Sequence, residues 1–140
     1  MHILMTGAAG MIGRKLTARL VKDGKLNGKS VDRLTLIDVV PPEKPEGFKG
    51  TVDATTSDLS APGAAAKAVA GKPDVIFHLA GVVSGEAEID FEKGYRVNLD
   101  GTRALFEAIR TSAYVPKVIF TSSIAVSAPH FLTRYPTNFI

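Results

Sequence analysis

Three glycines close to the N-terminus, Gly7, Gly10 and Gly13, have the spacing of a loop that holds phosphate groups. The first permits the positive φ of a tight turn, the second lets backbone approach a pyrophosphate, and the third lets a helix pack closely against a strand. Met11 and Ile12 would open that helix, whose free N–H groups attract anions. This loop is therefore predicted to bind a nucleotide; the alternative is that its glycines serve only the turn.

A carboxylate follows the second apolar segment of the chain. Asp38 lies near the end of the apolar run 34–39. At that position a carboxylate can accept both ribose hydroxyls of a dinucleotide, whereas a 2′-phosphate would meet its negative charge. Val39, Val40 and Pro41 come next, with no arginine to pair with such a phosphate. The pattern favours NAD over NADP, and the alternative reads Asp38 as the cap of a loop.

Strands and helices alternate along the chain. Apolar runs predict strands at His2–Thr6, Leu34–Val39, near Thr51 and Val52, at Val75–Leu79 and at Lys117–Thr121. Apolar residues three or four apart predict helices over Met11–Lys22, between Ser60 and Gly71, and over Glu88–Arg110. One side of the last helix carries Phe91, Tyr95, Leu99, Thr102, Phe106 and Ile109. This order predicts the α/β class, a doubly wound parallel sheet of about five strands with right-handed crossovers.

The predicted elements also supply the context that a nucleotide loop requires. The glycines follow a predicted strand and precede an amphipathic helix, and the second predicted strand ends near an acidic residue, Asp38. A glycine motif without these neighbours is a weak signal, whereas with them it indicates dinucleotide binding.

The charge pattern does not indicate nucleic-acid binding. The net charge is +3, and several cations share the polar side of the first helix: Arg14, Lys15, Arg19 and Lys22. No aromatic residues interleave with them and no nucleic-acid motif accompanies them. We interpret this surface as a solvated helix face.

Composition restricts the other classes of function. The absence of cysteine excludes disulfides, thiol catalysis and Cys-ligated metal sites. The three histidines, His2, His78 and His130, have no metal-ligand spacing, so no metal site is predicted. The longest apolar run, Val75–Val83, is too short for a membrane span of about 20 residues. These features are typical of a cytoplasmic protein with no membrane partner.

A set of short motifs follows in order between Met1 and Val126. They are Thr6-Gly7-Ala8-Ala9-Gly10-Met11-Ile12-Gly13, Asp38, His78-Leu79-Ala80-Gly81, Tyr95-Arg96-Val97-Asn98 with Gly101-Thr102, and Thr121-Ser122-Ser123. In this order and spacing they resemble the extended short-chain dehydrogenase/reductase family of NAD-dependent epimerases and dehydratases. The resemblance implies a Rossmann fold that binds NAD.

The resemblance further implies roles at the cofactor. Asp58 and Leu59 would contact the adenine. Leu79, Ala80 and Gly81 would line the ribose of the nicotinamide. These roles come from the family's pattern and not from the spacing of the residues themselves.

Other residues are matched by the same pattern. Asn98 would stabilise the helix and strand ends near the cofactor, and Thr121 and Ser122 would belong to the cofactor-binding residues. Ser123 would hydrogen-bond the reacting oxygen of the substrate. The alternatives are that the serines simply end a strand and that Asn98 is a helix-surface amide. His78 is interpreted as a structural core residue.

The resemblance places this chain nearest a branch of sugar-acid dehydrogenases and nucleoside-diphosphate-sugar epimerases. It implies NAD-dependent oxidation of a secondary alcohol on a sugar or sugar acid, for which the family uses a Tyr-x-x-x-Lys pair as the base. That pair is absent from the 140 residues: Tyr95 and Tyr114 precede the serines, and no lysine follows Tyr135. The chain is therefore expected to be catalytically inactive by itself.

The C-terminal segment departs from the family. Residues 1–126 are interpreted as an incomplete NAD-binding domain and 127–140 as an aberrant tail. Ser127-Ala128-Pro129-His130 stands where the family continues with an aromatic residue and a glycine. A one-base shift in one set of codons for this tail would restore Phe-Gly, so we expect a frameshift with early termination. The fifth strand would then be an exposed edge through which the chain could self-associate.

Two further hypotheses remain open. The first is a stand-alone NAD-binding or sensing module, or an interaction module, because the dinucleotide loop is whole. The second is a nucleoside-diphosphate-sugar epimerase or dehydratase, which would require the half of the family pattern that is absent here.

Overall fold

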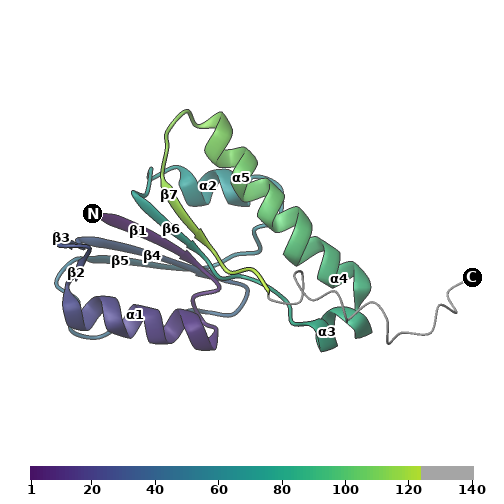
Figure 1. Ribbon diagram of the computed structural model, residues 1–140, viewed down its shortest axis with the longest axis horizontal. Helices are drawn as coiled ribbons and strands as arrows, with labels where there is room; N and C mark the ends of the chain where they lie inside the picture. The colour runs from purple at the N-terminus through teal and green to yellow at the C-terminus, as the bar shows by residue number, and fades with distance from the viewer. Residues whose placement is uncertain (124–140) are drawn as a thin grey trace, which may run out of the picture.

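The centre of the molecule is a five-stranded parallel sheet. The computed structural model describes residues 1–123, except for the side chain of Ser84, so the predicted boundary at 126/127 and the tail 127–140 lie outside the described residues. The strands are β1 (His2–Thr6), β4 (Arg33–Asp38), β5 (Thr51–Thr56), β6 (Val75–His78) and β7 (Lys117–Phe120). They lie in the order β5-β4-β1-β6-β7, and every pair in this sheet is parallel (Figure 1). The predicted fold class is confirmed.

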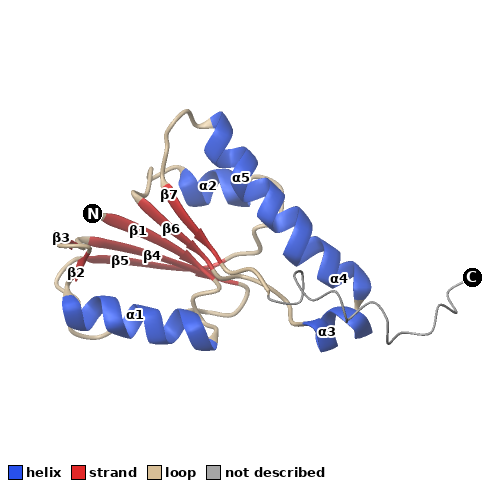
Figure 2. Cartoon of the chain, in the orientation of Figure 1, coloured by secondary structure: helices blue, strands red, loops and turns tan. Residues whose placement is uncertain are grey.

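Helices cover both faces of this sheet. Helix α1 (Met11–Asp23) lies on one face, while α2 (Ala64–Val69) and α5 (Thr102–Thr111) lie on the other (Figure 2). The arrangement is that of a doubly wound sheet, in which each crossover returns the chain to a parallel strand. Within residues 1–123, no helix has the length and apolar character needed to cross a membrane.

Successive residues of β1 point into two different core clusters. Ile3 and Met5 pack with Leu20 of α1 on one face of the sheet. Leu4 packs on the opposite face with Ile76 and Leu105. Because side chains alternate across a strand, a central strand that is covered on both faces must be apolar at every position. This requirement explains the uninterrupted apolar run that predicted β1.

A small hairpin follows α1, where the sequence indicated only the end of a helix. Strands β2 (Lys25–Leu26) and β3 (Lys29–Ser30) pair antiparallel. Asn27 and Gly28 connect them with φ of 49° and 78°. Two successive positive φ angles are those of a type I′ turn, which Asn-Gly favours.

The helix predicted over Glu88–Arg110 is confirmed from Phe91 onward, but its start differs, because the helical conformation is interrupted at Asp90. The structure has α3 (Ser84–Ile89), α4 (Phe91–Tyr95), the π-helical segment η1 (Arg96–Gly101) and then α5. Asp90 has φ −127° and ψ 86°, outside the helical region, and its Oδ1 accepts a hydrogen bond from Lys93 N at 3.0 Å. Its carboxylate thus caps a new helix, a role that a period count does not reveal.

The apolar stripe predicted on that helix lies mostly at the surface. Four members of the stripe are exposed: Phe91, Tyr95, Leu99 and Phe106. Leu105, on the inner side of α5, is fully buried instead. Leu105 belongs to the core cluster between the sheet and α2. Strand β7 is an edge of the sheet among the described residues.

One polar side chain lies in the core at the end of β6. His78 has no exposed surface, and its ring stacks on Phe120 with centroids 5.5 Å apart. Its Nδ1 lies 2.7 Å from Thr6 Oγ1, and its Nε2 lies 2.9 Å from Thr102 Oγ1. Both ring nitrogens therefore have hydrogen-bond partners, in agreement with the structural role predicted for this histidine.

Replacing Leu105 by alanine should lower the free energy of unfolding by about 2–5 kcal/mol, because it opens a cavity beneath α5. Phe106→Ala should cost less, because Phe106 is 44% exposed while Leu105 is 0% exposed. Urea unfolding of both variants and the parent chain measures the difference. Equal losses of unfolding free energy in the two variants would contradict the assignment of Leu105 to the buried face of α5 and Phe106 to the exposed face.

Burial lowers the pKa of the His78 imidazole below its ordinary value of 6.5. Below that value the unfolded chain binds a proton that the folded chain excludes, so the free energy of unfolding should fall as the pH drops from 7 towards 5. His78→Gln should flatten this slope in urea titrations at a series of pH values. Burial also lowers the pKa of His2, so part of the slope should persist. An unchanged slope in the variant would contradict the assignment.

Candidate functional site

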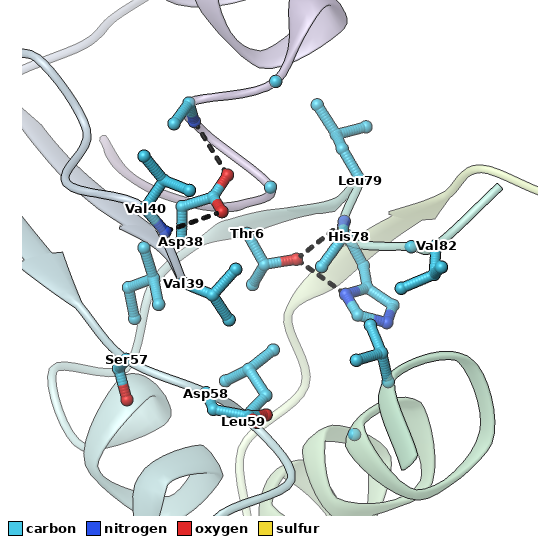
Figure 3. Close-up of a pocket in the computed structure, with 18 of the residues that line it drawn as sticks. Thr6, Asp38, Val39, Val40, Ser57, Asp58, Leu59, His78, Leu79 and Val82 are labelled. Carbon is cyan, nitrogen blue, oxygen red and sulfur yellow. Dashed lines mark hydrogen bonds between the residues drawn. The ribbon is translucent and has the colours of Figure 1, made fainter. Parts of the chain in front are cut away.

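A cavity of about 820 Å³ opens where the carboxyl ends of the parallel strands meet. Figure 3 shows its lining side chains, which come from the glycine loop, from the segments that follow β4, β5 and β6, and from the helical segment α3–η1. In open α/β sheets this edge is the usual place for a ligand. Eight predicted site residues line it: Gly7, Gly10, Asp38, Asp58, Leu59, Leu79, Ala80 and Gly81.

The glycine loop leaves no space for side chains at two of its positions. Gly7 has a φ of +72°, and a Cβ there would lie 2.6 Å from Ala80 N and from Leu79 C. A Cβ on Gly13 would lie 2.7 Å from Ala8 Cα and would also collide with Gly7 O. The loop is thus packed backbone to backbone against its neighbours, as the glycine spacing predicted.

The first turn of α1 begins at this cavity. No side chain caps the helix, and its first turn carries no acidic residue. Gly10 is the N-cap and lines the cavity, while Met11 and Ile12 are exposed side chains outside the lining. An uncapped N-terminus presents N–H groups and a partial positive charge, which together attract an anion such as phosphate.

Asp38 closes the neighbouring wall of the cavity. Its Oδ2 accepts a hydrogen bond from Ala9 N at 2.9 Å, and its Oδ1 accepts one from Val40 N at 3.3 Å (Figure 3). Val39 and Val40 line the cavity beside it and are exposed. The carboxylate therefore lies between the glycine loop and an apolar segment.

Asp58 supplies a second carboxylate. Its Oδ1 accepts hydrogen bonds from Ser60 N at 2.9 Å and Ser60 Oγ at 2.6 Å. Its Oδ2 lies 3.7 Å from Arg96 Nε. The hydrogen bonds from Ser60, with a smaller contribution from the Arg96 guanidinium, lower the pKa of Asp58. Oδ1 is occupied, so Oδ2 is the oxygen with capacity for a ligand's donor.

The segment after β6 is fixed from two sides. Thr6 O accepts a hydrogen bond from Leu79 N at 3.1 Å. From the other side, the Asn98 side chain accepts from Val82 N at 2.8 Å and donates to Val82 O at 3.0 Å. Asn98 does not line the cavity; it holds the backbone of a segment that does. The amide lies at an exposed position of η1, as the helix-surface interpretation has it, and it also ties this helical segment to Val82.

The residues after β7 lie apart from the lining. Thr121 donates to His78 O from both its backbone N and its Oγ1, each at 3.2 Å. Thr121, Ser122 and Ser123 are all exposed, and none of them lines the cavity. Tyr95 and Tyr114 also lie outside the lining.

Sequence reasoning missed several lining residues. Ala9 and Val82 adjoin predicted residues and could have been included by position. Glu86, Lys93 and Arg96 lie on α3, α4 and η1, and their place in the lining depends on how these helices pack, which no local pattern of the sequence shows. Lys93 Nζ forms an ion pair with Glu86 Oε1. Within the described part of the chain, no group of three His, Asp or Glu residues could hold a metal ion.

Comparison with known proteins agrees with this geometry. The model of the NAD dependent epimerase/dehydratase family matches residues 3–133. D-erythronate dehydrogenase from Cupriavidus necator is 45% identical over 130 residues, which make up 90% of this chain and 40% of that protein. D-erythronate dehydrogenase from Haemophilus influenzae is 34% identical over 126 residues, covering 90% of this chain and 39% of that protein.

Solved structures show the same fold. The nucleoside-diphosphate-sugar epimerase from Agrobacterium tumefaciens is 67% identical with a TM-score of 0.88, over 90% of this chain and 38% of that one. MoeE5 in complex with UDP-glucuronic acid and NAD is 27% identical with a TM-score of 0.72, over 90% and 38% of the two chains. This chain thus spans about two fifths of the length of these relatives. By the extent of the family match, the chain belongs to the NAD dependent epimerase/dehydratase family.

Proposed function

We propose that this chain binds NAD, as the cofactor-holding part of an oxidoreductase or epimerase that acts on a secondary alcohol of a sugar or sugar acid. The observation that carries the proposal is a single cavity lined by a glycine loop, by Asp38 and Asp58, and by the backbone of Leu79–Gly81. The names of two relatives, D-erythronate dehydrogenase and a MoeE5 complex containing NAD, support the cofactor and the substrate class.

The N–H groups at the start of α1 would bind the pyrophosphate, aided by the positive end of the helix dipole. Asp38 would accept the adenosine ribose hydroxyls, and Asp58 Oδ2 would accept from the adenine amino group beside Leu59. The nicotinamide ribose would lie against Leu79, Ala80 and Gly81. Thr121 and Ser122 would adjoin this end of the cofactor, outside the cavity lining.

NAD should bind in preference to NADP. A 2′-phosphate at the adenosine ribose would approach the Asp38 carboxylate, and the residues beside it that line the cavity are the apolar Val39 and Val40. The lining cations, Lys93 and Arg96, come from the α4–η1 segment, and each has a carboxylate partner. Repulsion between the 2′-phosphate and the Asp38 carboxylate, with no compensating cation beside it, should therefore weaken the binding of NADP.

Bound NAD would supply the hydride acceptor of the reaction, and the protein would supply the proton acceptor. Ser123 is our candidate for orienting the reacting hydroxyl of the substrate. The Tyr-x-x-x-Lys pair that would remove the proton does not occur in the 140 residues. We therefore expect this chain alone to bind the cofactor without turnover.

An NAD-binding or sensing module is the second candidate. It is favoured by one observation: among the described residues 1–123, those that line the cavity all lie between Thr6 and Gly101. A nucleoside-diphosphate-sugar epimerase or dehydratase is the third, supported by the similarity to the nucleoside-diphosphate-sugar epimerase from Agrobacterium tumefaciens.

Calorimetric titration of the purified chain tests cofactor binding. NAD should bind at least tenfold more tightly than NADP, a difference of about 1.4 kcal/mol. Asp38→Ala should narrow this ratio, because it removes the charge that opposes the 2′-phosphate. If neither cofactor binds to the folded chain, the proposal is wrong; equal binding of both would refute only the preference.

Gly13→Ala should weaken NAD binding at least tenfold, about 1.4 kcal/mol, because its Cβ would push the loop away from α1. Gly85→Ala is the matched control, since a Cβ at Gly85 meets no atom within 4 Å. The same titration measures both variants, with circular dichroism to confirm that each is folded. A folded Gly13→Ala chain with unaltered affinity would show that NAD does not use this loop.

A further inference from the structure

The carboxylate of Asp38 is already hydrogen-bonded before any ligand is considered. Oδ2 accepts from Ala9 N at 2.9 Å, and Oδ1 accepts from Val40 N at the longer distance of 3.3 Å. The first of these bonds joins β4 to the glycine loop, across the boundary between two separate segments of the chain. A residue that only received ribose hydroxyls would not need this contact.

We propose that Asp38 is also a positioning residue, which holds the glycine loop in its phosphate-binding shape through the hydrogen bond from Ala9 N. This role rests on the proposed function, because it concerns the same nucleotide cavity. It goes beyond that function by making Asp38 necessary for binding a phosphate that belongs to no adenosine ribose.

The bond lies just beyond the end of a strand pair. Pairing of β1 with β4 ends at Thr6 and Ile37, and the chain then turns towards α1. Ala8 N donates to Ile37 O at 3.2 Å, and Ala9 N donates to Asp38 Oδ2 one residue further on. The Asp38 side chain thus continues the attachment of the loop to β4 after the backbone ladder has ended.

This attachment divides the N–H groups of the loop into two sets. Those of Ala8, Ala9 and Gly10 are used within the protein, since Gly10 N donates to Gly7 O at 3.2 Å. The N–H groups at the start of α1 follow directly, where no side chain caps the helix. The first set of N–H groups fixes the shape of the loop, and the second set is available to bind an anion.

Both roles of Asp38 are compatible at the same time. Each carboxylate oxygen can accept two hydrogen bonds, so Oδ2 can keep Ala9 N while it accepts a ribose hydroxyl. Loss of the side chain would leave Ala9 N–H without its acceptor. The loop would then lose its connection to β4 at the residue that precedes the helix N-cap, Gly10.

Nicotinamide mononucleotide separates the two roles, because it carries a phosphate but no adenosine. Asp38→Ala should weaken its binding about fivefold or more, as measured by shifts of backbone amide resonances during titration. Asp38→Asn keeps one side-chain oxygen for Ala9 N and should lie closer to the parent chain. Asp53→Ala is the matched control: this carboxylate pairs with Arg33, does not line the cavity, and should leave the affinity unchanged.

If Asp38→Ala binds nicotinamide mononucleotide within twofold of the parent chain but binds NAD more weakly, the positioning role is wrong. The proposal that the chain binds NAD would still stand. Amide hydrogen exchange gives a second readout that needs no nucleotide. Asp38→Ala should speed exchange at Ala9 much more than at Ala8, whose acceptor is a backbone carbonyl. Unchanged exchange at Ala9 would overturn the inference even if the chain bound no nucleotide at all.

Discussion

The close approach of two backbone segments is the constraint on which the site depends. The glycine loop after β1 and the segment after β6 pass so near each other that a single Cβ on Gly7 would collide with Ala80 N. Neighbouring parallel strands bring their carboxyl ends together, so the segments that leave them compete for the same space. Glycine resolves this competition, and the space beyond the contact becomes the cavity. The hydrogen bonds of Asp38 and Asn98 then hold the two walls in place.

The sheet could be predicted from the sequence because its physical signal is local and strong. A strand covered on both faces must be apolar at successive positions, and β1, β4 and β6 satisfy this in their own residues. The extent of β5 was underestimated, since the strand runs from Thr51 to Thr56 through polar residues at the sheet edge. Edge strands carry a weaker pattern because water can cover part of their surface.

The candidate site was predictable where it depends on backbone shape and much less where it depends on tertiary packing. Gly7, Gly13 and Asp38 have roles that residue type and position nearly determine. Lys93 and Arg96 line the cavity through the packing of α4 and η1, and the start of this helical run at Asp90 is not marked by a period of three or four residues. Asn98 was assigned from the resemblance alone, and its paired hydrogen bonds to Val82 now give a physical reason for an amide at that position.

The π-helical segment η1 separates the two tasks of the long helical region. A π turn contains more residues than an α turn, so it rotates everything downstream about the helix axis relative to everything upstream. Residues before and within it form part of the cavity wall, and residues after it, such as Leu105, fill the core. Because of this rotational offset, one helical region can serve a ligand cavity near its start and the packed core near its end.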